Sequence, residues 1–187
     1  KIPFSMYDYQ TYFKLSSSQI VSHNSYTDWD LGFESSPDGW HIILNSSRFM
    51  YAGNTLITDF ESVKTISADT MIFDASSGNL DSTAVGKWIN FTDTQTPTFP
   101  KLVYIINRGK DELGNDFGYK KIVFENLENN TYYIRFANLD NTDEHRFLVP
   151  KDPSVNFVQF SFDGGGKIFN AQPEKNSWDL CFTKYTS

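Results

Sequence analysis

Two short stretches, "DWDLGF" at residues 28–33 and "SWDLCF" at residues 177–182, give nearly the same six residues near opposite ends of the chain. In an extended strand the tryptophan, leucine and phenylalanine of this motif share one face, because side chains alternate between the two faces. The aspartate lies on the opposite face near a turn, where its carboxylate can accept hydrogen bonds from backbone N–H groups. We interpret the motif as a core strand with a polar tether and assign this structural role to Trp29, Asp30, Trp178 and Asp179.

The similarity extends to the residues that precede each motif. Residues 12–35 and 159–184 both contain an aromatic strand, a polar or glycine-rich turn, a short apolar strand and a polar loop. The offset between matched positions grows slightly along the segment, as small loop insertions would produce. We therefore interpret the two segments as copies of one supersecondary unit. The matched positions are Phe13 with Phe160, Ile20 with Ile168, and Trp29 with Trp178.

Composition and periodicity favour an all-β fold. Phe, Trp and Tyr make up 17% of the 187 residues, and aromatic and β-branched residues are enriched in strands. Apolar residues alternate with a period of two at 119–127, 131–139 and 156–162. The stretch "KLVYIINRG" at 101–109 has the pattern of a more fully buried strand. We predict mostly antiparallel, curved sheets or a sandwich with little helix, and a helical turn is best placed at residues 58–66.

The charge pattern excludes two classes of partner. The chain has a formal net charge of −7 and contains no run of Lys and Arg. It therefore lacks the basic surface by which proteins bind nucleic acids or anionic membranes. The longest apolar run, "LVYII" at 102–106, is much shorter than a segment that spans a bilayer. We expect no nucleic-acid partner and no transmembrane segment in this chain.

The sequence contains no motif of a known catalytic or metal site. A nucleophile elbow, a zinc-protease helix and a Walker loop are all missing from it. The single cysteine, Cys181, has no basic residue beside it that would activate the thiol. No two of His23, His41 and His145 lie within one helical turn of each other, so local metal-ligand spacing does not occur. We expect a protein that is not an enzyme and has no metal site.

Several stretches between the two motifs occur in a fixed order. They are "HIILNS" (41–46), "GKWINFT" (86–92), "KLVYIINRG" (101–109), "YKKIVFENL" (119–127) and "TYYIRF" (131–136). Together with the first motif, their order and spacing resemble the HmuY-like haem-binding family over residues 9–138. Members of this family are surface lipoproteins of Gram-negative bacteria that capture haem for an outer-membrane receptor, and their fold is largely β.

The resemblance implies a division of the chain and a cellular setting. It implies one HmuY-like β domain over residues 1–145 and the start of a second, incomplete unit over residues 146–187. Few residues follow Trp178, so we expect the apolar strands of the second unit to be covered by a continuation of the chain, a partner or the first unit, in this order of preference. The implied location is the cell surface or outer membrane of a Gram-negative bacterium, with a lipid anchor upstream of this chain, or secretion.

The candidate ligand-binding residues are Trp40, His41, Met50, Met71 and Trp88. An aromatic ring beside an imidazole suits a flat ligand, and thioethers can bind haem iron. In the haemophores of the family, one axial ligand follows a Trp-x-x-Phe strand by two residues, and Asp93 stands at that position here. The resemblance therefore carries over no axial ligand, and haem is a candidate cofactor without an assigned residue.

Two functions of different classes are predicted. The first is a surface-exposed, outer-membrane-associated binding protein that resembles haemophores and captures haem or another small ligand for a TonB-dependent receptor. The alternative is a non-haem interaction module that serves as an accessory subunit or adhesive domain of an outer-membrane complex. A sharp Soret band after addition of haemin would favour the first function.

Overall fold

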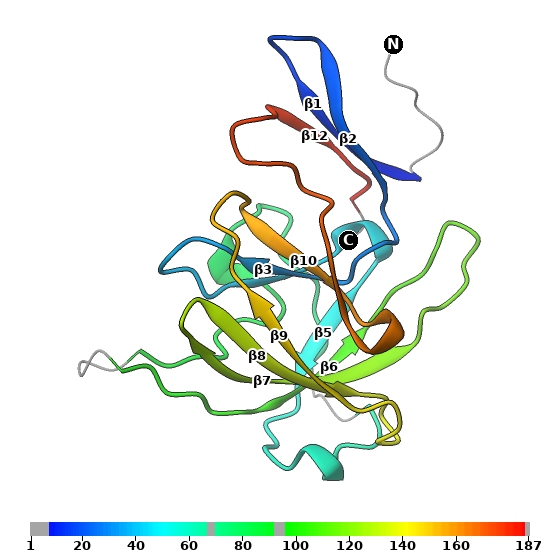
Figure 1. Cartoon of the computed structure of the whole chain (residues 1–187). Helices are drawn as coiled ribbons and strands as arrows, with labels where there is room; N and C mark the ends of the chain where they lie inside the picture. Colours follow the sequence, from blue (N-terminus) through cyan, green and yellow to red (C-terminus); the bar gives the residue numbers. More distant parts are fainter. Residues whose placement is uncertain (1–7, 67–69, 92–95, 186–187) are drawn as a thin grey trace.

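The computed structural model describes residues 8–66, 70–91 and 96–185. In these ranges the chain forms three antiparallel sheets and short 3₁₀ turns (Figure 1), which confirms the predicted all-β fold. The strands are β1 (Tyr9–Lys14), β2 (Gln19–Ser25), β3 (Leu31–Glu34), β4 (Ile42–Leu44), β5 (Tyr51–Asn54), β6 (Val103–Asn107), β7 (Tyr119–Glu128), β8 (Thr131–Ala137), β9 (His145–Pro150), β10 (Phe157–Ser161), β11 (Lys167–Phe169) and β12 (Leu180–Phe182). The 3₁₀ turns are η1 (Ser46–Arg48), η2 (Phe60–Ser62), η3 (Leu80–Ser82) and η4 (Asp163–Gly165).

The largest sheet has five strands in the order β5-β6-β7-β8-β9, and every neighbouring pair is antiparallel. Strand β6 is buried along its whole length. Its Tyr104 and Ile106 belong to the main hydrophobic core, whereas Val103 and Ile105 belong to a second cluster on the other face of the sheet. Burial on both faces explains why this strand has a continuous apolar run instead of an alternating pattern.

The second face of this sheet is covered by the segment around η2, which falls within the stretch predicted as a helical turn. Phe60 and Val63 of this segment pack against β6 and β7. Lys121 of β7 is fully buried beneath them, and its ammonium donates hydrogen bonds of 2.8 Å to the carbonyl oxygens of Phe60 and Val63. These carbonyl oxygens replace the water that a buried ammonium group would otherwise lose. The alternating pattern of β7 in the sequence does not reveal that Lys121 is buried in this way.

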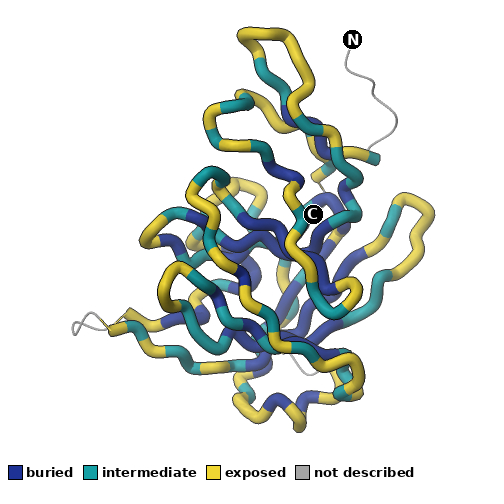
Figure 2. The backbone as a smooth tube through the Cα atoms, viewed as in Figure 1, coloured by how far each residue is buried: buried dark blue, intermediate teal, exposed yellow. Residues whose placement is uncertain are grey.

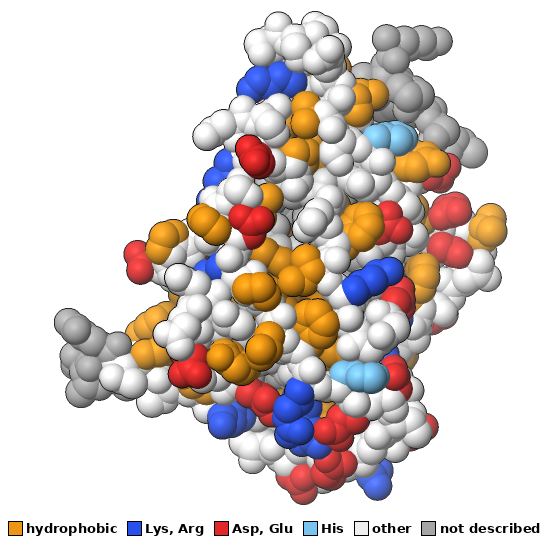
Figure 3. All heavy atoms as spheres, viewed as in Figure 1, with side chains coloured by type: hydrophobic (Ala, Val, Ile, Leu, Met, Phe, Trp, Pro, Cys, Tyr) orange, Lys and Arg blue, Asp and Glu red, His pale blue; other side chains and the backbone are white. Residues whose placement is uncertain are grey.

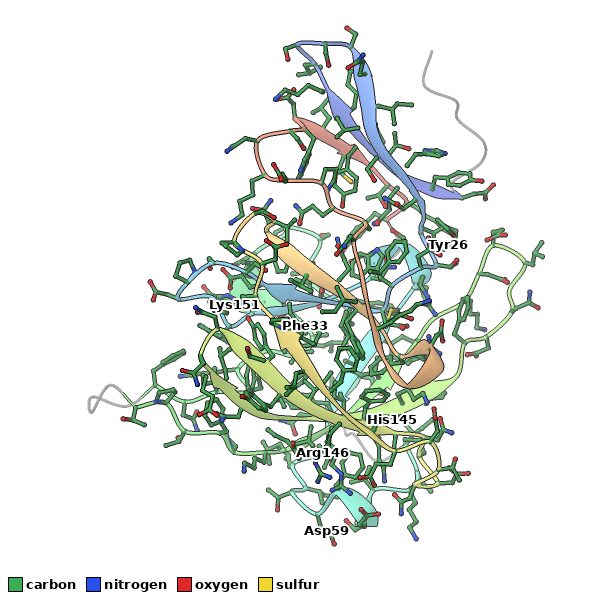
Figure 4. All side chains as sticks on the ribbon, viewed as in Figure 1. Tyr26, Phe33, Asp59, His145, Arg146 and Lys151 are labelled. Atoms are coloured by element: carbon green, nitrogen blue, oxygen red, sulfur yellow. The ribbon has the colours of Figure 1, made fainter. Side chains whose placement is uncertain are left out.

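The main core lies between the five-stranded sheet and a four-stranded sheet with the order β11-β10-β3-β4. Phe33 of β3 lies at its centre (Figure 4), with its ring centroid 5.1 Å from Tyr132 and 6.1 Å from Phe160. Figure 2 shows buried backbone concentrated between these sheets. The alternating residues of β8 and β10 are buried here, namely Tyr132, Ile134, Phe136, Val158, Phe160 and the adjoining Phe162.

The third sheet has the order β12-β1-β2 and projects from one end of the molecule (Figure 1). Its formation shows that the two copies of the repeat exchange strands. Hairpin β1–β2 of the first copy pairs with β12 of the second, and hairpin β10–β11 of the second copy pairs with β3 of the first. The registers of the two copies correspond. Phe13 pairs with Leu180 as Phe160 pairs with Leu31, and Phe13 pairs with Ile20 as Phe160 pairs with Ile168.

In the first copy Asp30 forms the polar tether. Its backbone N–H donates to the carbonyl oxygen of Phe160 at 2.7 Å, and its carboxylate accepts the backbone N–H of Phe162 at 2.9 Å. The same carboxylate forms ion pairs of 2.9 Å with Arg48 and Arg108. The side chains of Asp30 and Arg48 are fully buried, so this tether is a charged group within the protein interior.

The second copy repeats the tether in a more exposed setting. The backbone N–H of Asp179 donates to the carbonyl oxygen of Phe13 at 2.9 Å, and its carboxylate accepts the backbone N–H of Leu15 at 2.7 Å. Its cationic neighbour is Lys14 at 3.7 Å, and 37% of the Asp179 side chain is exposed. The same backbone arrangement is therefore built twice, once in the core and once near the surface.

The two tryptophans of the motif hold equivalent positions but differ in burial. Trp29 is 5% exposed, and its indole N–H donates to the side-chain oxygen of Gln10 at 2.8 Å. Trp178 is half-buried and packs edge-on against Tyr12, with the ring centroids 4.9 Å apart. The first tryptophan therefore contributes more buried apolar surface than the second.

The expected boundary at residues 145–146 falls at the start of β9. Strand β9 pairs with β8, and β10 pairs with β3, so strands from both sides of the boundary share sheets. Phe160 and Phe162 are 0% and 1% exposed in the main core. The expectation that a continuation or partner covers these two side chains is wrong, because the first unit covers them. Trp178 and Phe182 are only half-buried.

Among the described residues no helix is long and apolar enough to cross a membrane.

Candidate functional site

The loop between β3 and β4 is held in one conformation by the carboxylate of Glu34. This carboxylate accepts hydrogen bonds from the Ser36 hydroxyl at 2.6 Å and from the backbone N–H groups of Trp40 and His41, both at 3.2 Å. The Nδ1 atom of His41 lies 2.6 Å from the same carboxylate. Partial burial acts to raise the pKa of Glu34, but the hydrogen bonds from Ser36 and His41 hold it below its usual value. The ionised Glu34 carboxylate thus links the start of the loop to its end through hydrogen bonds.

Two further side chains, one in β8 and one directly after β9, form hydrogen bonds to the backbone of the same loop. The Tyr132 hydroxyl donates to the carbonyl oxygens of Glu34 and Gly39 at 2.7 and 3.2 Å. The Lys151 ammonium donates to the carbonyl oxygens of Ser36, Pro37 and Gly39 at 2.8, 3.0 and 2.6 Å, and Figure 4 shows Lys151 at this loop. The backbone of the loop is therefore fixed by Tyr132 and Lys151 as well as by Glu34.

Gly39 is required by the close packing inside this loop. A Cβ atom at this position would lie 2.4 Å from both the Cδ of Glu34 and the Oγ of Ser36. No real Cβ contact is that short, so any larger residue would displace the Glu34 carboxylate from the backbone groups that it binds. The glycine allows the loop to turn tightly just before Trp40.

The fixed loop places Trp40 in a group of aromatic rings. Its ring is stacked on His41, with centroids 4.0 Å apart, and lies 5.9 Å from the ring of Phe91 at an angle of 60°. Phe91 is 55% exposed. Behind them, the indole N–H of the buried Trp88 donates to the carbonyl oxygen of Trp40 at 2.9 Å. Trp40 and Phe91 therefore form an angled, accessible aromatic surface backed by the core.

A cleft of about 280 Å³ opens beside these rings. Its lining combines apolar side chains with carboxylates and side-chain amides. The Asn129–Asn130 turn between β7 and β8 supplies the amides, and both residues have positive φ angles of 50° and 56°, as a tight two-residue hairpin requires. The lining residues are Pro37, Asp38, Gly39, Trp40, Ile89, Phe91, Pro97, Leu127, Glu128, Asn129, Asn130 and Lys151.

This arrangement suits the binding of a neutral, amphipathic ring. Aromatic faces and prolines can cover an apolar face of a ligand, while amides and carboxylates at the rim can bond to its hydroxyl groups. Among the described residues that line the cleft, the only lysine is Lys151, which already donates three hydrogen bonds to carbonyl oxygens. Asp38 and Glu128 make the rim acidic. An anionic ligand would therefore meet like charge and no free cation.

The structure brings together three of the five candidate ligand-binding residues. Trp40 contacts both His41 and Trp88, although Trp88 is 3% exposed and serves as support. Met50 is 1% exposed within the main core. Met71 is half-buried against the second core cluster, on the other face of the five-stranded sheet. The two methionines are thus separate from the cleft.

The described residues do not fit haem at this cleft. One ring nitrogen of His41 is 2.6 Å from Glu34 and the other is 3.4 Å from Asp81, so neither is directed at an open position. Neither Met50 nor Met71 lines the cleft, so the described residues place no thioether there as a second axial ligand. Asp93, at the family's ligand position, lies outside the described residues. Across the described part of the chain, no group of three His, Cys, Asp or Glu side chains could hold a metal ion.

Several residues of the cleft were not identified from the sequence. Phe91 is the phenylalanine of the predicted Trp-x-x-Phe strand, and its period-two relation to Ile89 would have placed both on one side. Asn129 and Asn130 carry a turn signal but no binding signal. Glu34, Tyr132 and Lys151 act only through contacts with distant segments, for which a single sequence contains no local pattern.

The stability that Glu34 contributes should depend on pH. Because its pKa is lowered in the folded protein, its contribution is present above the ordinary Glu pKa of 4.5 and is lost as pH falls through the folded value. We expect the difference in free energy of unfolding between the wild type and Glu34→Gln to be largest near neutral pH and to shrink below about pH 4.5. Urea unfolding over a pH series measures this difference, and a constant difference would contradict the assignment.

Comparison with protein-family models, with curated proteins and with solved structures gave no match.

Proposed function

We propose that this protein is a non-catalytic binding protein whose Trp40 cleft takes the ring of a neutral saccharide. The observation that carries this proposal is the loop at residues 35–40, fixed by Glu34, Tyr132 and Lys151 so that Trp40 is presented beside an open cleft. A preformed site avoids the entropic cost of ordering a loop when the ligand binds. Rigid loops that carry accessible aromatic side chains are a common basis for recognition.

The chemistry of the cleft favours a saccharide over an anionic or metal-bound ligand. A pyranose ring has an apolar face of C–H groups that can stack on Trp40 or Phe91, and hydroxyl groups at its edge. Asn129, Asn130 and Glu128 provide donors and acceptors for those hydroxyls at the rim. The carboxylates of haem would instead face the acidic rim. The cleft volume of about 280 Å³ also suits a small ring better than a porphyrin.

The proposed cellular setting rests on the resemblance to HmuY-like proteins. In that setting the protein is displayed at the outer surface of a Gram-negative bacterium and works with a TonB-dependent receptor or another outer-membrane subunit. Saccharide binding fits the interaction-module alternative, in which an accessory or adhesive domain recognises a surface polymer. The tests of ligand class do not depend on this setting.

The proposal is tested by screening neutral saccharides on a glycan array and titrating the best one by calorimetry. Trp40→Ala should weaken binding by at least about fivefold, because a stacked aromatic contact contributes about 1 kcal/mol beyond its buried area. Trp40→Phe should retain part of the affinity. Tyr9→Ala removes an exposed aromatic residue from β1, far from the cleft lining, and should have no effect.

Two results would overturn the proposal: no saccharide binds at millimolar concentration, or Trp40→Ala binds as tightly as the wild type. Haemin provides the contrasting outcome. A sharp Soret band with a six-coordinate spectrum would instead support the haem-capture function. It would require axial ligands other than His41.

A further inference from the structure

Lys151 lines two clefts of the protein, and only one of them belongs to the site described above. The first is the Trp40 cleft. The second has a volume of about 170 Å³, and we call it the Ile168 cleft after a strand residue in its wall. Among the described residues, Lys151 is the one that lines both. The two clefts therefore adjoin at a single residue.

The Ile168 cleft lies between the end of β9 and the strands β10 and β11. Pro150 is the last residue of β9, Phe157 is the first of β10 and Ile168 is the middle residue of β11. Phe157 is half-buried and Ile168 is 36% exposed, so part of the lining is an accessible apolar surface. Figure 3 shows hydrophobic side chains gathered over β9 and β10 on the face that it draws.

Lys151 forms a rigid ridge between the two clefts. Its ammonium donates to three carbonyl oxygens of the loop before Trp40, at distances of 2.6–3.0 Å. Its backbone N–H donates to the carbonyl oxygen of Asn130 at 2.7 Å, and Asn130 lines the Trp40 cleft. Because the loop binds the charged end of the side chain, the aliphatic stem is the part that remains for contact with a ligand.

Amide side chains of the Ile168 cleft are fixed by the fold. Gln159 and Gln172 are 5% and 8% exposed. The side-chain oxygen of Gln172 accepts the backbone N–H groups of Asn156 and Phe157 at 3.1 and 3.0 Å. The backbone N–H of Gln172 donates to the side-chain oxygen of Gln159 at 3.3 Å. Asn170 adds an exposed amide at the rim, so the cleft combines apolar and amide groups as the Trp40 cleft does.

The charge of the Ile168 cleft also matches that of the Trp40 cleft. The carboxylate of Asp152 accepts hydrogen bonds from the backbone N–H and the hydroxyl of Ser154 at 2.9 and 2.6 Å, and these bonds hold the pKa of Asp152 below its usual value. Among the described residues that line the Ile168 cleft, the only cationic one is Lys151. Both clefts therefore favour a neutral ligand with apolar faces and hydroxyl groups.

We propose that the two clefts bind different rings of one neutral oligosaccharide, so that the ligand is a chain of sugar residues and not a free monosaccharide. This inference rests on the saccharide proposal and adds chain length to it. One ring stacks at Trp40, the chain crosses the stem of Lys151, and a later ring lies against Ile168. The covalent link between the rings makes the second contact intramolecular, which raises the affinity.

The experiment titrates the whole protein by calorimetry with neutral oligosaccharides of increasing length. The probes are the mono-, di-, tri- and hexasaccharides of β-1,4-linked glucose, α-1,4-linked glucose and β-1,4-linked mannose. In at least one series the affinity should rise by about tenfold or more from the monosaccharide to the trisaccharide. The backbone amide signals of Ile168 and Asn170 should shift with the trisaccharide and not with the monosaccharide.

The repeat supplies a matched pair of variants. Ile168 and Ile20 hold corresponding positions opposite Phe160 and Phe13, and they are 36% and 40% exposed. Ile168→Lys should remove most of the gain from chain length and leave monosaccharide affinity unchanged, since a charged side chain replaces the apolar wall of the second cleft. Ile20→Lys should change neither, because Ile20 lines neither cleft. Circular dichroism and thermal unfolding establish that both variants are folded.

Two results would overturn this inference alone: monosaccharide and trisaccharide bind equally well in a Trp40-dependent manner, or Ile168→Lys retains the full gain from chain length. In both cases the saccharide proposal stands. If none of the three series binds at millimolar concentration, the chain-length inference fails and the glycan array decides the saccharide proposal.

Discussion

Replacing Asp30 by alanine is expected to lower the free energy of unfolding by about 3–5 kcal/mol, because it leaves buried cations without their partner. Asp30 is fully buried between Arg48 and Arg108, and its carboxylate also accepts the backbone N–H of Phe162. Burial lowers the pKa of Arg48, and Asp30 is the main group that acts against this. For Arg108, burial also acts to lower the pKa, but Asp30 and Asp163 hold it above its usual value. Chemical denaturation of the wild type and the variant measures the loss.

The repeat supplies the control for this measurement. Asp179 makes the same two backbone contacts as Asp30, but its side chain is 37% exposed and its ion pair with Lys14 is 3.7 Å long. Asp179→Ala should therefore cost only about 0.5–1.5 kcal/mol, the usual value of one hydrogen bond and an exposed ion pair. Equal losses for the two variants would show that backbone tethering, and not the buried charge, dominates at both sites.

Replacing Trp29 by alanine should cost about 3–5 kcal/mol, because it removes a large side chain from a nearly closed environment. The indole is 5% exposed, and its N–H donates to Gln10 at 2.8 Å. Gln10 would lose this partner, and Gln10 is itself only 5% exposed, so an unsatisfied polar group adds to the cavity. Urea unfolding followed by circular dichroism measures the change without relying on tryptophan fluorescence.

The equivalent substitution Trp178→Ala should cost about 1–2 kcal/mol, since half-buried side chains lose less on truncation. Its indole ring makes an edge-on contact with the ring of Tyr12, with centroids 4.9 Å apart. The ratio of the two losses is more informative than either alone, because the two residues share sequence context and backbone geometry. A larger loss at Trp178 than at Trp29 would mean that the small sheet, and not the main core, limits stability.

The strands could largely be predicted from the sequence, but their pairing could not. The period-two pattern located β8 and β10 and their apolar faces, on which Tyr132 and Phe160 are buried. The matched positions also identified the duplicated unit. The hairpins β1–β2 and β10–β11 offer nearly the same edge. The sequence therefore does not show whether β3 pairs with β1 of its own copy or with β10 of the other copy. Packing of Phe160 and Phe162 on the five-stranded sheet decides between them, and that contact is made between distant segments.

The candidate site was predictable only where its residues are close in sequence. Trp40 and His41 were identified as an adjacent pair, and Trp88 as an aromatic residue in a motif of its own. The groups that fix and shape the cleft come from β8, the β7–β8 turn and the residue after β9. The sequence around Lys151 gives no indication of its role. The carbonyl groups that it binds lie far away in the sequence and reach it only in the folded protein. The two methionines were selected for their chemistry, but burial in the cores separates them from the cleft.

The exchange of strands between the two copies gives the protein a high contact order. Strand β1 lies between β2 and β12, and β3 lies between β4 and β10, so each of them has one neighbour that is distant in sequence. Strands β6 to β9, in contrast, pair with their neighbours in sequence and can form early. During synthesis the first hairpin leaves the ribosome long before its third strand exists, and pulse-labelled amide exchange should find β12 among the last strands protected. Strand β1 is thus made well before β12 and acquires this one of its two native neighbours late.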